Sequence, residues 1–181
     1  MASSSILLPL FIIVASAAAA RSPGLDYIAS SCKVTRYPAV CVSSLSPYAA
    51  SLKGKPSQSE LVKAALNVSL QNTQNVTAWA VALGKTSKGL SKRERSALKD
   101  CVQNFGDSSE QTKQSLAELK QLRAGTFKFQ MNNVQTWMSA ALTNEDSCLN
   151  GFQGVRNGKV KVLVNGQVQD SSKLISNALA L

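Results

Sequence analysis

The sequence predicts an all-α protein: an antiparallel four-helix bundle with an N-terminal α-helical hairpin extension and two disulfides. Three observations support this prediction. Apolar or small residues recur every three or four positions over long segments, which is the period of an amphipathic helix. Ser-x-x-Glu capping signals begin two of these segments, at Ser57 and at Ser91. The four cysteines are an even number, and two of them fall within the long helical segments.

Residues 1–20 are predicted to be a secretory signal peptide, followed by one bundle domain over residues 21–181. An apolar run from Ile6 to Val14 precedes small residues that end at Ala20, which is typical of a cleaved signal. The alternative is a membrane anchor, but the run is too short to cross ~30 Å of hydrocarbon as a helix. No later segment is apolar enough to span a membrane, so no membrane contact is expected after cleavage.

Two short helices are predicted at the start of the domain, over Leu25–Ser30 and Pro38–Leu45. Tyr37 precedes a proline and is therefore biased away from the helical region, which separates the two helices. Pro38 suits the first position of a helix, where its missing N–H has no partner to lose. Pro47 and Pro56 mark the linker that follows.

Three long helices are predicted next, each from a seam of apolar or small residues. Ser57 and Ser91 cap the first two, and the third runs from Phe127 to Phe152. The polar run Asn144–Asp146 is expected to weaken this third helix. The seam residues are Val62, Leu66, Ser69, Thr73, Val76, Ala80 and Leu83; then Leu98, Cys101, Phe105, Ser108, Thr112, Leu116, Leu119 and Leu122; then Phe127, Met131, Val134, Met138, Ala141, Cys148 and Phe152.

The C-terminal part is predicted to hold an extended connection over Lys159–Gln169 and a final helix over Ser171–Leu181. The alternation in KVKVLVNGQVQ and its Asn165–Gly166 turn make a short β-hairpin the alternative for the connection. A final helix of about eleven residues is too short to cover its neighbours at ~1.5 Å per residue. Either the bundle is open at one end, or a partner or neighbouring chain covers it.

The four cysteines allow three pairings. Cys32 and Cys41 are close in the sequence and lie on either side of the Tyr37–Pro38 break, which favours a small closed hairpin. Cys101 and Cys148 would then join two long helices across the core. Disulfides of this kind agree with a secreted chain.

Composition excludes several kinds of active site. The chain has no histidine, which removes Ser-His-Asp and Cys-His catalysis and histidine-based zinc sites. Paired cysteines leave no thiolate, and the glycines at Gly151, Gly154 and Gly158 follow a helix instead of opening one, so no phosphate loop is formed. The ten carboxylates are interpreted as solvated groups on helix faces. No metal site, cofactor or catalytic residue is expected, and Trp79 and Trp137 are interpreted as core residues.

The net charge of +10 favours an acidic partner such as an anionic polysaccharide, an anionic lipid or an acidic protein. Six basic residues and one acid, Glu94, lie between Lys85 and Lys99. This segment is either a solvated helix boundary or a patch for an acidic polymer. It has no interleaved aromatic residues, which argues against single-stranded nucleic acid.

Two glycosylation sequons, at Asn67 and Asn75, lie on the first long helix. They are eight residues apart, which places them roughly 12 Å apart along the helix axis. A glycan at either position would close that face of the helix to a partner.

Four segments together resemble the plant pectin methylesterase inhibitor family, within the wider invertase/pectin methylesterase inhibitor group. The most specific is Asn133-Val-Gln-Thr-Trp-Met-Ser-Ala-Ala-Leu-Thr143, which is followed by Cys148. The others are Cys32 to Cys41 with Thr35-Arg-Tyr-Pro38 between them, Leu98-Lys-Asp-Cys101 with Phe105-Gly-Asp107, and Ser176-Asn-Ala-Leu-Ala-Leu181. The resemblance covers nearly all of the chain after the signal peptide.

The resemblance implies the bundle with its hairpin, and the same disulfide pairing. It also implies a secreted, non-catalytic protein of the cell wall (apoplast) that binds pectin methylesterase one to one and covers the pectin cleft. The contact face would lie on Ser91–Arg123 and Thr126–Gly151. The contact residues carried over from the family are Gln103, Gln135 and Ser147, together with Asn133 and Thr136 of the most specific segment.

Three alternatives to this function remain. The invertase-inhibiting branch usually has Pro-Lys-Phe where this chain has Phe127-Lys-Phe129, so an invertase target is less favoured. The chain also resembles the pro-region of a larger pectin methylesterase, because it stops at Asn177-Ala-Leu-Ala-Leu181. Finally, the +10 charge would suit a basic pectin-binding wall protein with no enzyme target.

Overall fold

The structure is a computed structural model that describes residues 22–52, 57–156 and 158–181. The predicted signal peptide and the Ala20–Arg21 cleavage point lie outside these residues. Within them the regular secondary structure is entirely helical. The α-helices are α1 Pro23–Ser31, α2 Pro38–Leu45, α3 Gln58–Thr86, α4 Lys92–Leu119, α5 Phe127–Gly151 and α6 Lys159–Ala180, with short 3-10 turns at Cys32–Val34, Ser46–Tyr48 and Ala124–Thr126.

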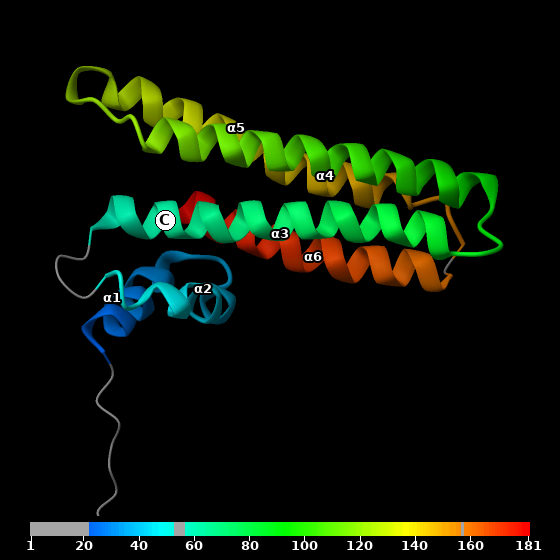
Figure 1. Cartoon of the computed structure of the whole chain (residues 1–181), viewed down its shortest axis with the longest axis horizontal. Coiled ribbons are helices and arrows are strands. Elements are labelled where there is room, and N and C mark those ends of the chain that lie inside the picture. Colours follow the sequence, from blue (N-terminus) through cyan, green and yellow to red (C-terminus); the bar gives the residue numbers. More distant parts are fainter. Residues whose placement is uncertain (1–21, 53–56, 157) are drawn as a thin grey trace, which may run out of the picture.

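The four long helices form an antiparallel bundle (Figure 1). Each long helix packs against the next one in the chain, and α6 packs back against α3, which closes the ring. The hairpin of α1 and α2 lies beside the bundle, where α2 contacts α3 and α6. Tyr37 ties this hairpin to the bundle: its backbone N–H donates to Oδ1 of Asn177, and its carbonyl accepts from Nδ2 of Asn177, at 3.1 and 2.9 Å. The predicted fold class is confirmed.

One of the two predicted capping boxes forms completely. The Ser91 hydroxyl accepts from the Glu94 backbone N–H at 3.2 Å, and Glu94 Oε2 accepts from the Ser91 N–H at 2.8 Å. These bonds from Ser91 hold the pKa of the Glu94 carboxyl below its ordinary value. Ser57 caps α3 in the same way, but the Glu60 carboxylate turns instead to Lys63, 3.0 Å away. At Ser57, the predicted hydrogen bond from the Glu60 backbone N–H to the serine hydroxyl therefore forms, but the return bond to the Glu60 carboxylate does not.

The extended connection predicted for Lys159–Gln169, and its β-hairpin alternative, are wrong, because α6 is continuous from Lys159 to Ala180. Its buried residues follow helical spacing: Val160, Val164, Val168, Ser171, Ile175 and Ala178. Burying this stripe against α3 and α5 outweighs the weak helix propensity of valine and of Gly166. The final helix has 22 residues, about twice the predicted length, against 29, 28 and 25 in α3, α4 and α5. It covers most of their length, but the turn between α4 and α5 extends beyond it (Figure 1).

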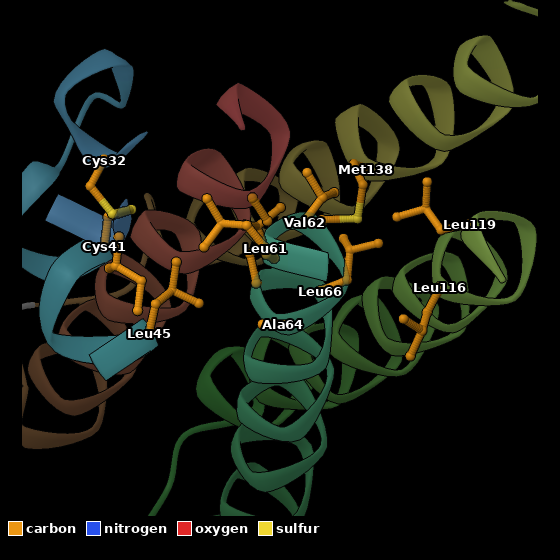
Figure 2. Close-up of a cluster of buried hydrophobic side chains, with 14 of the residues drawn as sticks. Cys32, Cys41, Leu45, Leu61, Val62, Ala64, Leu66, Leu116, Leu119 and Met138 are labelled. Carbon is orange, nitrogen blue, oxygen red and sulfur yellow. A yellow bond between two sulfur atoms is a disulfide. The ribbon is translucent and has the colours of Figure 1, made fainter. Parts of the chain in front are cut away.

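The buried apolar side chains form two clusters, one toward each end of the bundle. The first core holds the hairpin and the adjoining halves of the long helices; Figure 2 shows Leu45 and the Cys32–Cys41 disulfide of the hairpin beside Leu61 of α3. The second core surrounds the other disulfide. Its largest fully buried side chains are Phe105 and Phe152.

A layer of polar residues separates the two cores. All seven of its members are completely buried: Ser69, Thr73, Ser108, Thr112, Ser115, Glu145 and Ser171. Every long helix contributes at least one of them, and on each helix the first core lies to one side and the second core to the other. Several of these hydroxyls donate a hydrogen bond to a backbone carbonyl, as Ser108 does to Ala141 at 2.9 Å. We call these seven residues the polar layer.

Glu145 is the member of the polar layer that carries an ionisable group. Its Oε1 accepts from the Ser171 hydroxyl at 3.1 Å, while its Oε2 has no hydrogen-bond partner among the described residues. Loss of hydration raises the pKa of this carboxyl from 4.5 to about 8. The interpretation of the carboxylates as solvated groups is therefore wrong for Glu145. The expected weakening at Asn144–Asp146 is also wrong, since α5 continues to Gly151.

Both predicted disulfides are present, Cys32–Cys41 and Cys101–Cys148, with Cα–Cα distances of 5.7 and 4.4 Å. The α5 seam is confirmed by the burial of Val134, Met138, Ala141, Cys148 and Phe152. The prediction that Phe127 belongs to this buried seam is wrong. Its side chain is 52% exposed, because Phe127 begins α5 beyond the end of α4. The two tryptophans, Trp79 and Trp137, are half-buried instead of fully inside the core.

Candidate functional site

The outward face of α5 is uncharged over most of its length. No charged residue lies between Lys128 and Glu145, and Glu145 itself is buried. Apart from Phe129, which is 67% exposed in the first turn of α5, the residues that this stretch exposes are polar and neutral: Asn132, Gln135, Thr136, Ser139 and Thr143. In a chain of net charge +10, such a surface can offer hydrogen bonds to another protein without removing charges from water. We call these five residues the neutral face.

Gln135 and Thr136, two of the predicted contact residues, lie together on the neutral face. With Asn132 and Ser139 they line a shallow polar depression of about 480 Å³. Gln135 also borders an apolar cavity of about 300 Å³, whose wall includes Val62, Leu122, Phe127 and Met131. The Gln135 amide therefore lies between a polar and an apolar surface and can serve a partner on either side.

Asn133 lies apart from these two, in the seam between α5 and α4. Its side chain is half-buried, and Nδ2 donates to Glu118 Oε1 at 3.4 Å. A second bond of the same kind joins Asn144 to Gln111 at 3.0 Å. Asn133 thus contributes to helix pairing and holds the neutral face in place relative to α4.

Gln103 and Ser147 lie on either side of the Cys101–Cys148 disulfide, and both are exposed. Ser147 is twelve residues from Gln135 along α5, about 18 Å along the helix axis. The Ser147 hydroxyl donates to the Thr143 carbonyl at 2.9 Å, which leaves its oxygen free to accept. The predicted contact residues therefore form two separate groups along the α4–α5 pair, and only a partner the size of a protein could touch both.

Gln130, which the sequence did not single out, fixes the turn between α4 and α5. It is only 7% exposed. Its Oε1 accepts from the Arg123 backbone N–H at 2.8 Å and from the Thr126 hydroxyl at 3.0 Å, and its Nε2 donates to the Gln121 carbonyl at 3.0 Å. A buried glutamine with these three bonds gives the helix pair that carries the neutral face a defined turn. A glutamine on a helix carries no sign of this role in the sequence, because only the structure shows that Gln130 is buried.

Basic residues gather at the end of the bundle where α3 meets α4 and α5 meets α6 (Figure 1). The Arg93 guanidinium packs against Gly154, and Glu94 Oε1 approaches Gly158, so the two connections adjoin. We call this surface the basic end. Its basic residues are Lys85, Lys88, Lys92, Arg93, Arg95, Lys99, Arg156, Lys159 and Lys161, nine of the 20 in the chain, and all except the half-buried Lys161 are exposed.

The two sequon asparagines differ in exposure. Asn75 is exposed on α3, whereas Asn67 is half-buried. Ser69, the third residue of the first sequon, is completely buried, and its hydroxyl has no hydrogen-bond partner in the part of the chain that the structure describes. The second sequon is therefore the more accessible of the two.

Within residues 22–52, 57–156 and 158–181, no group of three or more His, Cys, Asp or Glu side chains is placed to hold a metal ion. Over the same residues, none of the helices is both long and apolar enough to cross a bilayer. The surfaces described above offer hydrogen bonds, apolar contact and positive charge, all of which serve binding.

Comparison with known proteins identifies the group of sequences to which the chain is similar. The family described as plant invertase/pectin methylesterase inhibitor matches residues 26–181. The chain is 42% identical over 174 residues to a 21 kDa protein of Daucus carota, covering 94% of this chain and 89% of that one. It is 41% identical over 184 residues to pectinesterase inhibitor 9 of Arabidopsis thaliana, covering 97% and 89%.

The fold is also found in a solved structure. A crystal structure of a mutant form of a pectin methylesterase inhibitor from Arabidopsis superposes with a TM-score of 0.66, at 17% identity, over 84% of this chain and 93% of that chain. This likeness shows a shared fold, and the family itself is shown by the match over residues 26–181 and by the two relatives. The chain belongs to the plant invertase/pectin methylesterase inhibitor family.

Proposed function

We propose that this protein is a non-catalytic inhibitor of pectin methylesterase, which binds the enzyme one to one and covers its pectin-binding cleft. The observation that carries the proposal is membership of the inhibitor family over residues 26–181. The relative named pectinesterase inhibitor 9 extends over 97% of this chain, so the likeness includes both the hairpin and the bundle.

The neutral face of α5 supports the same proposal. Gln135 and Thr136 would bond to the enzyme at one point, and Gln103 and Ser147 at a second point beside the disulfide. Each buried hydrogen bond of this kind contributes ~0.5–1.5 kcal/mol net. Asn133 would act through its bond to Glu118, by keeping α4 and α5 in register.

Titration of the purified protein into a pectin methylesterase assay tests the proposal. We expect activity to fall in proportion to added protein until the two are equimolar. Gln135→Arg should weaken inhibition about tenfold or more, because it places a charge in a buried neutral contact. The matched control is Gln74→Arg, an exposed position on α3, which should leave inhibition unchanged.

Two results would count against this function. Undiminished activity of several plant pectin methylesterases would refute it. Inhibition of a cell-wall invertase instead would assign the chain to the other branch of its family. The pro-region alternative is decided separately, by reading the transcript beyond Leu181.

We also propose that the protein is secreted to the apoplast and carries a glycan. The support is the signal pattern of residues 1–20 and the exposure of Asn75 on α3. The intact mass of protein collected outside plant cells should give an N-terminus at Arg21. After enzymatic removal of glycans, the measured mass should fall to that of the polypeptide. The Asn75→Gln variant should have the polypeptide mass without this treatment if Asn67 carries no glycan. Protein retained in the cells at full length would contradict secretion.

A further inference from the structure

We propose that a groove at the basic end binds acidic polysaccharide with free carboxylates, the polymer that pectin methylesterase leaves after removing methyl groups. The binding itself needs no enzyme, but its purpose rests on the function proposed above. An inhibitor held on the product would be concentrated where the enzyme has already acted.

The groove lies between the end of α3 and the start of α4 and has a volume of about 320 Å³. Its lining is apolar, and two cations, Arg95 and Lys99, border it. The apolar lining residues that define it are Ala80, Leu90, Leu98 and Val102. A sugar ring has an apolar face of C–H groups and polar edges. A uronate ring laid on this floor would place its carboxylate toward the two cations.

The cations are spaced to follow a linear polyanion. Lys92, Arg95 and Lys99 are separated by three and four residues, so they lie along one side of α4 over about 10 Å. Arg95 can hold a carboxylate with two parallel hydrogen bonds, whereas the lysines act as point charges. A chain of uronates offers one carboxylate after another to such a row.

The cations of the basic end form no ion pair with the other residues that the structure describes. Among the described residues, the ion pairs join Lys63 to Glu60, Lys113 to Glu110 and Lys173 to Asp170, all elsewhere. The Glu94 carboxylate is occupied by the Ser91 N–H and hydroxyl. These cations are therefore available to an external acid.

The α5–α6 connection extends the surface beyond one sugar. Arg156 and Lys159 lie at this connection, which adjoins the first turn of α4 through the packing of Arg93 on Gly154, whereas Lys161 donates to the Val155 carbonyl at 3.0 Å. Once one sugar of a polymer is bound, its neighbours are held at a high effective concentration near the other cations. A long chain should therefore bind far better than a single sugar. Gln103 lies one turn beyond Lys99 on the same helix, which places bound polymer beside a proposed enzyme contact.

Binding of polygalacturonate, measured by affinity electrophoresis or calorimetry without enzyme, tests the inference. We expect binding at low salt, a loss of about tenfold or more at 0.5 M NaCl, and little binding of highly methyl-esterified pectin. Arg95→Gln/Lys99→Gln should weaken binding at least about tenfold, as expected when two desolvated charge contacts are lost. The control Lys113→Gln/Lys120→Gln removes the same charge from exposed positions on α4 and at its C-cap and should have less than a threefold effect.

Equal losses in the two double variants would overturn the site, because the effect would then follow net charge alone. Equal binding of single-stranded DNA or phosphatidylserine vesicles, with the same sensitivity to Arg95 and Lys99, would assign the groove to another ligand class. Arg95 and Lys99 lie on a helix proposed to contact the enzyme, so inhibition by the Arg95→Gln/Lys99→Gln variant is not the readout for the groove. Polymer binding measured without enzyme decides this inference, whereas absent inhibition by the wild type with intact polymer binding counts only against the proposed function.

Discussion

The free energy of unfolding should fall by roughly 4 kcal/mol between pH 5 and pH 8, because Glu145 must lose its proton inside the bundle. Its carboxyl is completely buried, and its pKa is raised to about 8 in the folded state, against an ordinary value of 4.5. Between these two values the folded chain binds more protons than the unfolded chain. The stabilisation is therefore complete below about pH 4.5 and is lost as pH rises toward 8.

Urea unfolding at several pH values measures this effect. Glu145→Gln keeps a neutral polar side chain in the layer, so its stability should vary much less between pH 5 and pH 8 and should exceed that of the wild type at pH 8. Glu110→Gln is the matched control, since Glu110 is exposed on α4. Parallel pH profiles for the wild type and Glu145→Gln would show that this carboxyl does not control stability.

Removing the Cys101–Cys148 disulfide should cost roughly 4 kcal/mol in the chain-entropy model, because it closes a long loop in the unfolded chain. The two cysteines are 47 residues apart and join α4 to α5 within the second core. Cys101→Ser/Cys148→Ser should therefore unfold at a clearly lower urea concentration under the same conditions. It should also weaken inhibition, since Gln103 and Ser147 flank the bridge.

The hairpin disulfide provides the comparison for this experiment. Cys32 and Cys41 are nine residues apart, so Cys32→Ser/Cys41→Ser should cost only roughly 2.5–3 kcal/mol. A smaller loss for the Cys101–Cys148 pair than for the hairpin pair would contradict loop closure as the source of stability.

The candidate site was only partly predictable. Gln135 and Thr136 do lie side by side, since neighbouring residues on an exposed helix face stay neighbours in any bundle. The exposure of Gln103 could also be expected from its position two residues after the buried Cys101. Asn133, however, turns toward Glu118 in the seam, and the groove at Arg95 and Lys99 needs α3 as its other wall. These features depend on how the helices face one another.

The sequence by itself determined the helical class, favoured the observed cysteine pairing among the three possible ones, and located the α3 and α4 seams except for Leu122, which lies beyond the end of α4. These follow from local periodicity, capping and loop length, which act within one segment of chain. Only the tertiary structure decided that Lys159–Gln169 is helix, that Phe127 is exposed and that Glu145 is buried. In each case the outcome is set by contact with other helices, and the free energy of burying a shared surface outweighs what the local sequence favours.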